Sequence, residues 1–172
     1  MRKPFTLAQI NSLPREDFVC VVGPVFEDSP WIADATWTGH PFKSIDDLHK
    51  ALCKTVQKSA EAKQIDLIRA HPDLVGRAAL AGTLTAASTS EQASGGLNKL
   101  TADEISLFQN SNQAYREKFD FPFVICARLN KKEAILKGFQ ARLEHSREEE
   151  IKTALAEIEK IAYLRLQDII ES

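Results

Sequence analysis

Apolar residues recur along this chain at the three- and four-residue spacing that is typical of amphipathic α-helices. Ser44 can cap one such helix, because its hydroxyl can accept a hydrogen bond from the first turn. The apolar stripe that follows contains Ile45, Leu48, Leu52 and Val56. No long alternating run and no Asn-Gly or Asp-Gly hairpin signal interrupts the pattern. We therefore expect an all-α fold, a single-domain bundle of about eight or nine helices over residues 1–172.

Two capping boxes predict where later helices begin. Thr101 with Glu104, and Ser146 with Glu149, have the spacing at which each side chain binds the other residue's backbone N–H. The stripe after the first box is Ile105, Phe108, Asn112, Tyr115 and Phe119. The stripe after the second is Ile151, Leu155, Ile158, Ala162 and Ile169. Both sets predict helices with one buried face.

Prolines mark other boundaries. Ser29 and Pro30 have the residue types of an N-cap and a first helical position, which predicts a short helix with Trp31 and Ala35 facing inward. Pro72 disfavours helical geometry in the residue before it, so the helix that starts at Glu61 should end near His71.

Two stretches do not fit a long helix. Residues 121–127 are apolar, contain a proline and are short, which predicts a buried extended segment or a tight turn. Residues 84–99, rich in Ala, Ser, Thr and Gly, predict a loop with a short helix. Asn130 and Glu133 form a weaker capping pattern before the stripe Ile135, Phe139 and Leu143.

Composition narrows the class of protein. Of 172 residues, 44% are hydrophobic and 27% are charged, so a globular core needs no disulfide or metal. The net charge of −2 argues against nucleic acid as a partner, and the chain lacks the run of about 18 apolar residues that a membrane span requires. No secretory signal is visible, and Cys20, Cys53 and Cys126 have no paired spacing. We expect a cytoplasmic protein with reduced cysteines.

The segment His71-Pro72-Asp73-Leu74 could carry chemistry. A helix that ends at a His-Pro step holds the imidazole in a defined place, and histidine exchanges protons near neutral pH. The same residue could instead cap the end of the preceding helix. Residue type and position alone do not separate the two roles.

A second polar segment runs from Ser88 to Gln92 and is followed by Gly95 and Gly96. Ser88 or Ser90 could cap a short helix whose free N–H groups face an anion or an amide-rich ligand. The alternative is a solvated helix start that ends at the glycines.

Arg165 is an anomaly on the last predicted helix, because it lies at the edge of the apolar face. A guanidinium that faces the interior needs a charged or multiply accepting partner. That partner is either an internal carboxylate or a substrate carboxylate, and Arg142 is a competitor for the same role. The remaining histidines show no metal-ligand spacing, and no phosphate loop, nucleophile elbow or dinucleotide fingerprint occurs.

Five blocks, taken in order and with their spacing, resemble the 2-oxo-4-hydroxy-4-carboxy-5-ureidoimidazoline (OHCU) decarboxylase family. The blocks are Phe26-Glu27-Asp28-Ser29-Pro30-Trp31, His71-Pro72-Asp73-Leu74, Ser88 to Gln92 with Gly95-Gly96-Leu97, Phe119 to Cys126, and the terminal helix with Arg165. The resemblance extends from about Leu13 to Ile170. Asp120 departs from it, because many relatives are expected to have glycine there.

The resemblance implies an all-helical homodimer without cofactor or metal. It implies decarboxylation of OHCU to (S)-allantoin, the third step from urate, with His71 as catalytic histidine, Glu91 as catalytic acidic residue and Arg165 as the family's arginine. The substrate-contacting positions that it implies are Pro72, Ser88, Thr89, Ser90, Glu91, Gln92, Phe123, Val124, Ile125, Cys126 and Ala127.

These assignments form one hypothesis. His71 exchanges a proton with the substrate, Glu91 assists, and Arg165 balances negative charge. The Gln92 amide and the backbone of residues 123–127 bind the ureido and ring amide groups. Two alternatives are a non-enzymatic helical interaction module and a metal-dependent helical hydrolase that uses His71 and Glu91.

Overall fold

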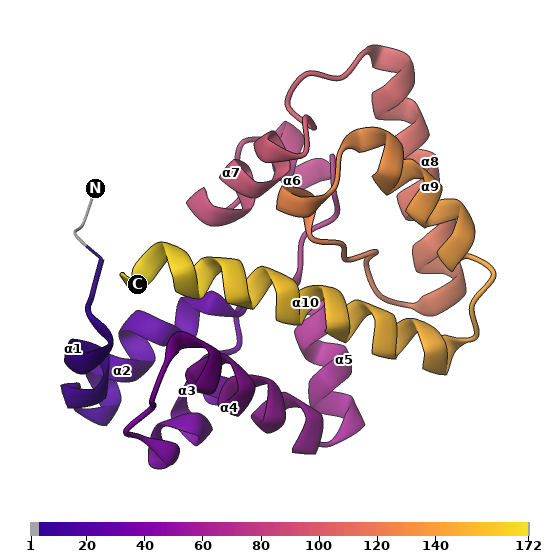
Figure 1. The fold of residues 1–172 in the computed structure, drawn as a ribbon. Helices are drawn as coiled ribbons and strands as arrows, with labels where there is room; N and C mark the ends of the chain where they lie inside the picture. The colour runs from indigo at the N-terminus through magenta and orange to yellow at the C-terminus, as the bar shows by residue number, and fades with distance from the viewer. Residues whose placement is uncertain (1–3, 172) are drawn as a thin grey trace. The chain divides into compact units, whose positions relative to one another are not determined.

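The structure, a computed structural model, describes residues 4–171, and the regular secondary structure in that range is helical (Figure 1). The helices are α1 (Leu7–Ser12), α2 (Arg15–Val22), α3 (Pro30–Thr36), α4 (Ile45–Lys58), α5 (Glu61–Ala70), α6 (Arg77–Leu80), α7 (Ala86–Ser94), α8 (Ala102–Phe119), α9 (Lys132–Arg142) and α10 (Arg147–Ile169). Short 3₁₀ turns are η1 (Gly23–Val25), η2 (Trp37–Gly39) and η3 (Ala127–Leu129). Within the described range no β-strand occurs, and Phe5 and Ile170 form an isolated bridge. The all-α prediction is confirmed.

The chain divides into two compact units. Unit 1 comprises the residues up to Ala70 together with those from Glu159 onward, and unit 2 is His71–Ile158. We describe each unit by itself, and the expectation of one domain over residues 1–172 stays a prediction.

In unit 1, α3 packs against α2 and α4. The predicted cap of α4 is confirmed, because the Ser44 hydroxyl accepts a hydrogen bond from Asp47 N at 3.0 Å. Ser29 and Pro30 also begin α3 as predicted, but the predicted inward face is wrong. The buried residues are Ile32, Ala33 and Thr36, whereas Trp31 is half-buried and Ala35 is exposed. The tertiary partners of this short helix, rather than its own periodicity, decide its buried face.

Unit 2 has an aromatic core around Tyr115, which contacts the rings of Phe119, Phe121, Phe123 and Phe139. Helix α8 supplies Tyr115 and begins at the predicted capping box, in which both hydrogen bonds are present. Four residues of its predicted stripe are buried, namely Phe108, Asn112, Tyr115 and Phe119.

Two connections in unit 2 shape the candidate site. After α8 the chain turns at Asp120, whose φ of 62° is left-handed, into residues 121–126, which are mostly buried and belong to neither helix nor strand. This confirms that the segment is buried and is not a long helix, whereas Ala127, the last residue of the predicted range, begins η3. The predicted cap at Asn130 is wrong, because α9 begins after Lys131. The Asn130 amide instead donates to the Cys126 carbonyl at 3.0 Å, which supports the end of the same segment.

Candidate functional site

The loop that begins at His71 is buried and strained. His71 is 6% exposed and directly follows α5. The helix therefore ends where the position of Pro72 led us to expect. Val75 has a φ of 54°, a left-handed conformation that costs a β-branched residue roughly 1–3 kcal/mol. The next residue is Gly76. A side chain would not fit there, because a Cβ would lie 2.6 Å from Cβ of Asp73. The chain therefore holds the histidine at the start of a tightly defined loop.

Helix α7 presents two different faces. Its N-cap is Thr85, whose hydroxyl accepts from Ser88 N at 3.1 Å, so the predicted caps Ser88 and Ser90 are wrong. Ser88 and Gln92 are buried and Glu91 is half-buried, as the i, i+3, i+4 spacing of one helix face requires. Thr89 and Ser90 are exposed on the rest of the helix, and their assignment to substrate stays a prediction.

The Gln92 amide holds the His71 loop. Its Oε1 accepts a hydrogen bond from Val75 N at 3.1 Å, and its Nε2 donates weakly to the Asp73 carbonyl at 3.4 Å. We expected this amide to bind substrate, but the loop backbone occupies its carbonyl oxygen. Because Gln92 follows Glu91 directly, these bonds also define where Glu91 lies relative to the loop.

Two charged side chains hold the backbone of residues 123–127. Arg142 Nη1 donates to the Val124 carbonyl at 2.7 Å, and Glu157 Oε2 accepts from Cys126 N at 2.9 Å. Burial raises the pKa of the Cys126 thiol, and the nearby carboxylates of Glu157 and Glu91 raise it further. The Cys126 thiol therefore stays protonated near neutral pH.

The C-terminal end of α7 packs directly on η3. A Cβ on Gly95 would lie 3.2 Å from the Ala127 carbonyl oxygen, which explains a glycine at this position. Lys131 Nζ donates to the Ser94 carbonyl at 2.8 Å beside this contact. Helix α7 thus connects the two predicted substrate-binding regions of unit 2, the His71 loop through Gln92 and the 123–127 segment through η3.

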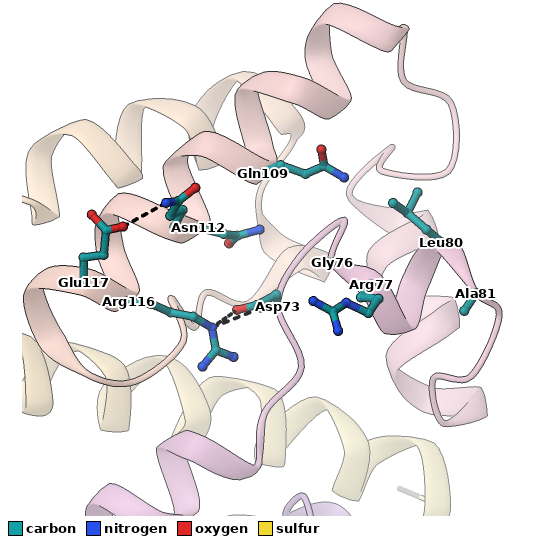
Figure 2. A pocket seen from close by; sticks show the side chains of 10 residues that line it. Asp73, Gly76, Arg77, Leu80, Ala81, Gln109, Asn112, Arg116 and Glu117 are labelled. Carbon is teal, nitrogen blue, oxygen red and sulfur yellow. Dashed lines mark hydrogen bonds and ion pairs between the residues drawn. The ribbon is translucent and has the colours of Figure 1, made fainter.

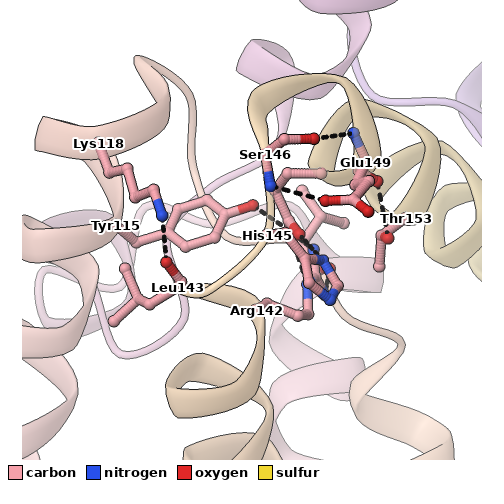
Figure 3. A network of polar contacts seen from close by, with 10 residues as sticks. Tyr115, Lys118, Arg142, Leu143, His145, Ser146, Glu149 and Thr153 are labelled. Atoms are coloured by element: carbon pink, nitrogen blue, oxygen red, sulfur yellow. Dashed lines mark hydrogen bonds and ion pairs between the residues drawn. The ribbon is translucent and has the colours of Figure 1, made fainter.

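Arg142 belongs to a buried polar network in unit 2 (Figure 3). Its guanidinium forms an ion pair with Glu150, which is fully buried, and lies 4.2 Å from the centre of the Phe123 ring. Tyr115 Oη donates to the same carboxylate, and His145 Nδ1 lies 2.8 Å from it. Burial and the hydrogen bond to Glu150 raise the pKa of Tyr115, so the phenol stays protonated and donates. Arg142 therefore supports the 123–127 segment from within the core.

Arg165 lies in unit 1, where it has an internal carboxylate partner. Its Nη2 donates to Glu27 Oε1 at 2.8 Å, and both residues are buried. The Pro24 and Val25 carbonyls lie at 3.5 Å from Nη1. This arrangement matches the internal-partner alternative, and the catalytic assignment of Arg165 stays a prediction.

Sequence reasoning missed three residues of the site region, Asn112, Glu150 and Glu157. Asn112 had a usable signal, because it is the polar member of an otherwise apolar stripe and is buried. Glu150 and Glu157 had none, because acidic residues are common on helices near a capping box. In the described part of the chain, no group of three or more His, Cys, Asp or Glu residues could hold a metal ion.

Comparison with known proteins identifies the class. The sequence model of the OHCU decarboxylases matches residues 11–167. The OHCU decarboxylase of Halalkalicoccus jeotgali is 42% identical over 95% of this chain and 91% of its own length. That of Amia calva is 42% identical over 96% of this chain and 94% of its own length. A crystal structure of (S)-allantoin synthase superposes with a TM-score of 0.78 at 27% identity, over 98% of this chain and 55% of that chain.

These matches span nearly the whole chain and agree with the helical fold. The chain belongs to the OHCU decarboxylase family. The resemblance recognised in the five sequence blocks is confirmed. A search of the described residues for a helix long and apolar enough to cross a membrane found none.

Proposed function

We propose that His71 and Glu91 are the acid–base pair with which this chain decarboxylates OHCU to (S)-allantoin in urate degradation. Membership of the family makes the chain a carboxy-lyase. The observation that supports these two residues is the attachment of α7. Gln92 binds the loop that begins with His71, and Glu91, the residue before it, is half-buried on the face of α7 that also carries the buried Ser88.

The reaction suits such a pair. The bond between the ring carbon and its carboxylate breaks, CO₂ leaves, and the bonding electrons pass into the conjugated C=N group of the imidazoline. The hydroxyl on the same carbon loses a proton and becomes a carbonyl, while the nitrogen and the carbon of the former C=N group each gain a proton, the carbon on one face. Because the substrate accepts the electrons itself, the protein needs to supply orientation and proton transfer and no organic electron sink. His71 and Glu91 exchange these protons.

The backbone of residue 125 is suited to bind the amide groups of the substrate. The Val124 carbonyl and both backbone groups of Cys126 are bonded to other parts of the protein. Among the described residues, no hydrogen bond engages the N–H or C=O of Ile125, which is half-buried. A ureido or ring amide offers the matching acceptor and donor.

The test is to produce OHCU in situ by enzymatic oxidation of urate followed by ring hydrolysis, and then to add this protein. Circular dichroism should report faster formation of one allantoin enantiomer, because protonation occurs on one face. A rate and an optical signal equal to those of the reaction without the protein would reject the proposed function.

Membership of the family also supports a homodimer of single-domain subunits that needs no cofactor. It further supports a cytoplasmic enzyme whose ligand is a small-molecule substrate. These points carry their own tests. Sedimentation should give twice the subunit mass, and unfolding should be one cooperative transition. Activity should survive exhaustive chelation, because the proposed chemistry uses no metal.

A further inference from the structure

The loop of residues 73–75 is held by three side chains from two helices of unit 2. Asn112 Nδ2, from α8, donates to the Leu74 carbonyl at 2.7 Å, and this bond is buried. Arg116 Nε, one turn later, donates to both carboxylate oxygens of Asp73 at 2.9 and 3.1 Å. Gln92 of α7 holds Val75 N. Three consecutive residues after His71-Pro72 are thus each fixed by a separate side chain.

Figure 2 shows how this loop is approached from α8. Asn112 and Arg116 project from α8 toward the loop that carries Asp73 and Gly76. All four residues line a groove of about 980 Å³. Arg116 and Asp73 lie at its rim and are partly exposed, whereas Asn112 is 6% exposed. The asparagine is therefore the buried contact from α8 to this loop.

The Asn112 amide is only half satisfied. Its Nδ2 binds Leu74, but its Oδ1 has no hydrogen-bond partner. A buried acceptor without a partner reduces stability, and each such group calls for an explanation. An apolar residue would continue the stripe of Phe108, Tyr115 and Phe119 without that cost. The amide at this position is thus better explained by its bond to the loop than by core packing.

That bond opposes a conformational strain. Val75 occupies the left-handed region, and a valine released from its contacts would return to an extended conformation. Such a change would move Leu74 and, through the rigid φ of Pro72, the backbone of His71. The Leu74 carbonyl is the group adjacent to Val75, so Asn112 acts where the strain is stored.

We propose that Asn112 is a positioning residue for His71, which it serves by binding the Leu74 carbonyl and so keeping the strained loop in place. The inference rests on the proposed function of His71. In this role Asn112 acts through the loop and does not contact the reacting atoms. Its loss misplaces the imidazole, and displacements of about 1 Å near a catalytic group can lower turnover about a hundredfold.

The experiment compares Asn112→Leu with Asn110→Leu. Asn110 lies on the exposed face of the same helix and serves as the matched control. We expect Asn112→Leu to lower kcat by roughly tenfold or more with little change in KM, and Asn110→Leu to change neither. The imidazole Cε1–H resonance of His71, assigned by its absence from His71→Asn, should shift in Asn112→Leu and stay unchanged in Asn110→Leu.

The kinetic and NMR measurements distinguish failure of the proposed function from failure of the positioning role of Asn112. If the wild type lacks decarboxylase activity, the proposed function fails, while the His71 resonance still tests positioning without substrate. A folded Asn112→Leu with wild-type kcat and an unmoved His71 resonance would overturn the inference.

Asn112→Asp covers the case in which the leucine variant does not fold. A carboxylate would place a second acceptor against the Leu74 carbonyl, whereas a protonated carboxyl could donate to it. The kcat of this variant relative to wild type should therefore rise as the pH is lowered, measured on protein that circular dichroism shows to be folded. The charged residues that line the groove with Asn112 are Asp73, Arg77, Arg116 and Glu117, and they are common to both proteins. Asp73 and Arg116 are paired with each other. A ratio that does not vary with pH would count against the inference.

Discussion

Glu27 and Arg165 form a buried ion pair that joins two sequence blocks 138 residues apart. The Glu27 Oε1 and Arg165 Nη2 atoms are 2.8 Å apart, and each side chain is 8% exposed. The pair fixes the turn after η1 to the part of α10 that belongs to unit 1. A charge pair in this position couples its two partners, because either charge alone would be buried without compensation.

Glu27→Gln should lower the free energy of unfolding by about 3 kcal/mol, because it leaves the guanidinium buried without its counter-charge. Chemical denaturation measures this loss. The control is Asp34→Asn, which removes the exposed ion pair between Arg15 and Asp34 in the same unit and should change stability little. Equal losses for both variants would show that burial does not strengthen the Glu27–Arg165 pair.

His71→Asn should lower kcat about a hundredfold or more, because asparagine retains hydrogen bonding but cannot exchange a proton near neutral pH. The product should approach a racemate as the uncatalysed decay takes over. His40→Asn, in unit 1, serves as the control and should retain full turnover. Melting curves of both variants separate lost chemistry from lost structure. A folded His71→Asn enzyme that still makes one enantiomer at the wild-type rate would remove His71 from the mechanism.

The cysteines should differ sharply in reactivity. Cys20 is exposed, whereas Cys53 and Cys126 are buried, and burial raises the pKa of Cys53 to about 12. Since the thiolate is the nucleophile, an aromatic disulfide reagent at pH 8 should label Cys20 rapidly and the other two after unfolding. Rapid labelling of all three thiols in the folded protein would contradict this assignment.

The same pKa shift predicts a dependence of stability on pH. A thiol in the unfolded chain ionises near pH 8.5, well below the pKa of about 12 of Cys53 in the folded protein. The unfolded state therefore loses its proton first, and stability should fall as the pH rises above about 8.5. Cys53→Ala should flatten this part of the curve, and an unchanged slope would assign the effect to other groups.

Asp120→Gly should stabilise the protein by about 0.5–1 kcal/mol. Asp120 follows α8 with a φ of 62°, which glycine adopts without steric cost, and a negative charge at this position is disfavoured by the helix dipole. The melting temperature should rise by about 2–4 °C per kcal/mol for a chain of this size. Asp120→Asn, which removes the charge and keeps a side chain of similar size, should have a melting temperature between those of the wild type and Asp120→Gly. A glycine variant no more stable than wild type would mean that other contacts of Asp120 outweigh both effects.

Hydrophobic spacing and capping residues predicted the fold class and the start of α4, α8 and α10, because these signals lie within the helix that they describe. The prediction of about eight or nine helices agrees with the eight helices of seven or more residues among the ten found within residues 4–171. Helices α1 and α6 have six and four residues, too few for a periodic pattern. Asn130 had the residue type of a cap, but its amide serves the Cys126 carbonyl. A local pattern does not reveal such a tertiary partner.

The order of short motifs indicated His71 and Glu91 as candidate site residues, and their catalytic roles stay predictions. The supporting residues of the site could not be predicted in this way. Valine is disfavoured at positive φ, so no local signal predicts that Val75 adopts a left-handed turn. Likewise, no local signal predicts that the Gln92 amide binds the backbone N–H of Val75, and its expected contact with substrate stays a prediction. Long-range contacts determine both outcomes.

The pairing of Phe5 with the C-terminal end of α10 has a consequence for biosynthesis. Phe5 N donates to the Ile169 carbonyl at 2.8 Å, and Glu171 N donates to the Phe5 carbonyl at 2.9 Å. Unit 1 therefore combines the earliest and the latest translated of the described residues, while unit 2 is one continuous stretch of chain. On the ribosome, the contacts of unit 1 with residues 159–171 form only after these residues emerge, whereas unit 2 has all its residues available earlier. Folding during synthesis should thus start in the middle of the chain, which reverses the usual order from the N-terminus.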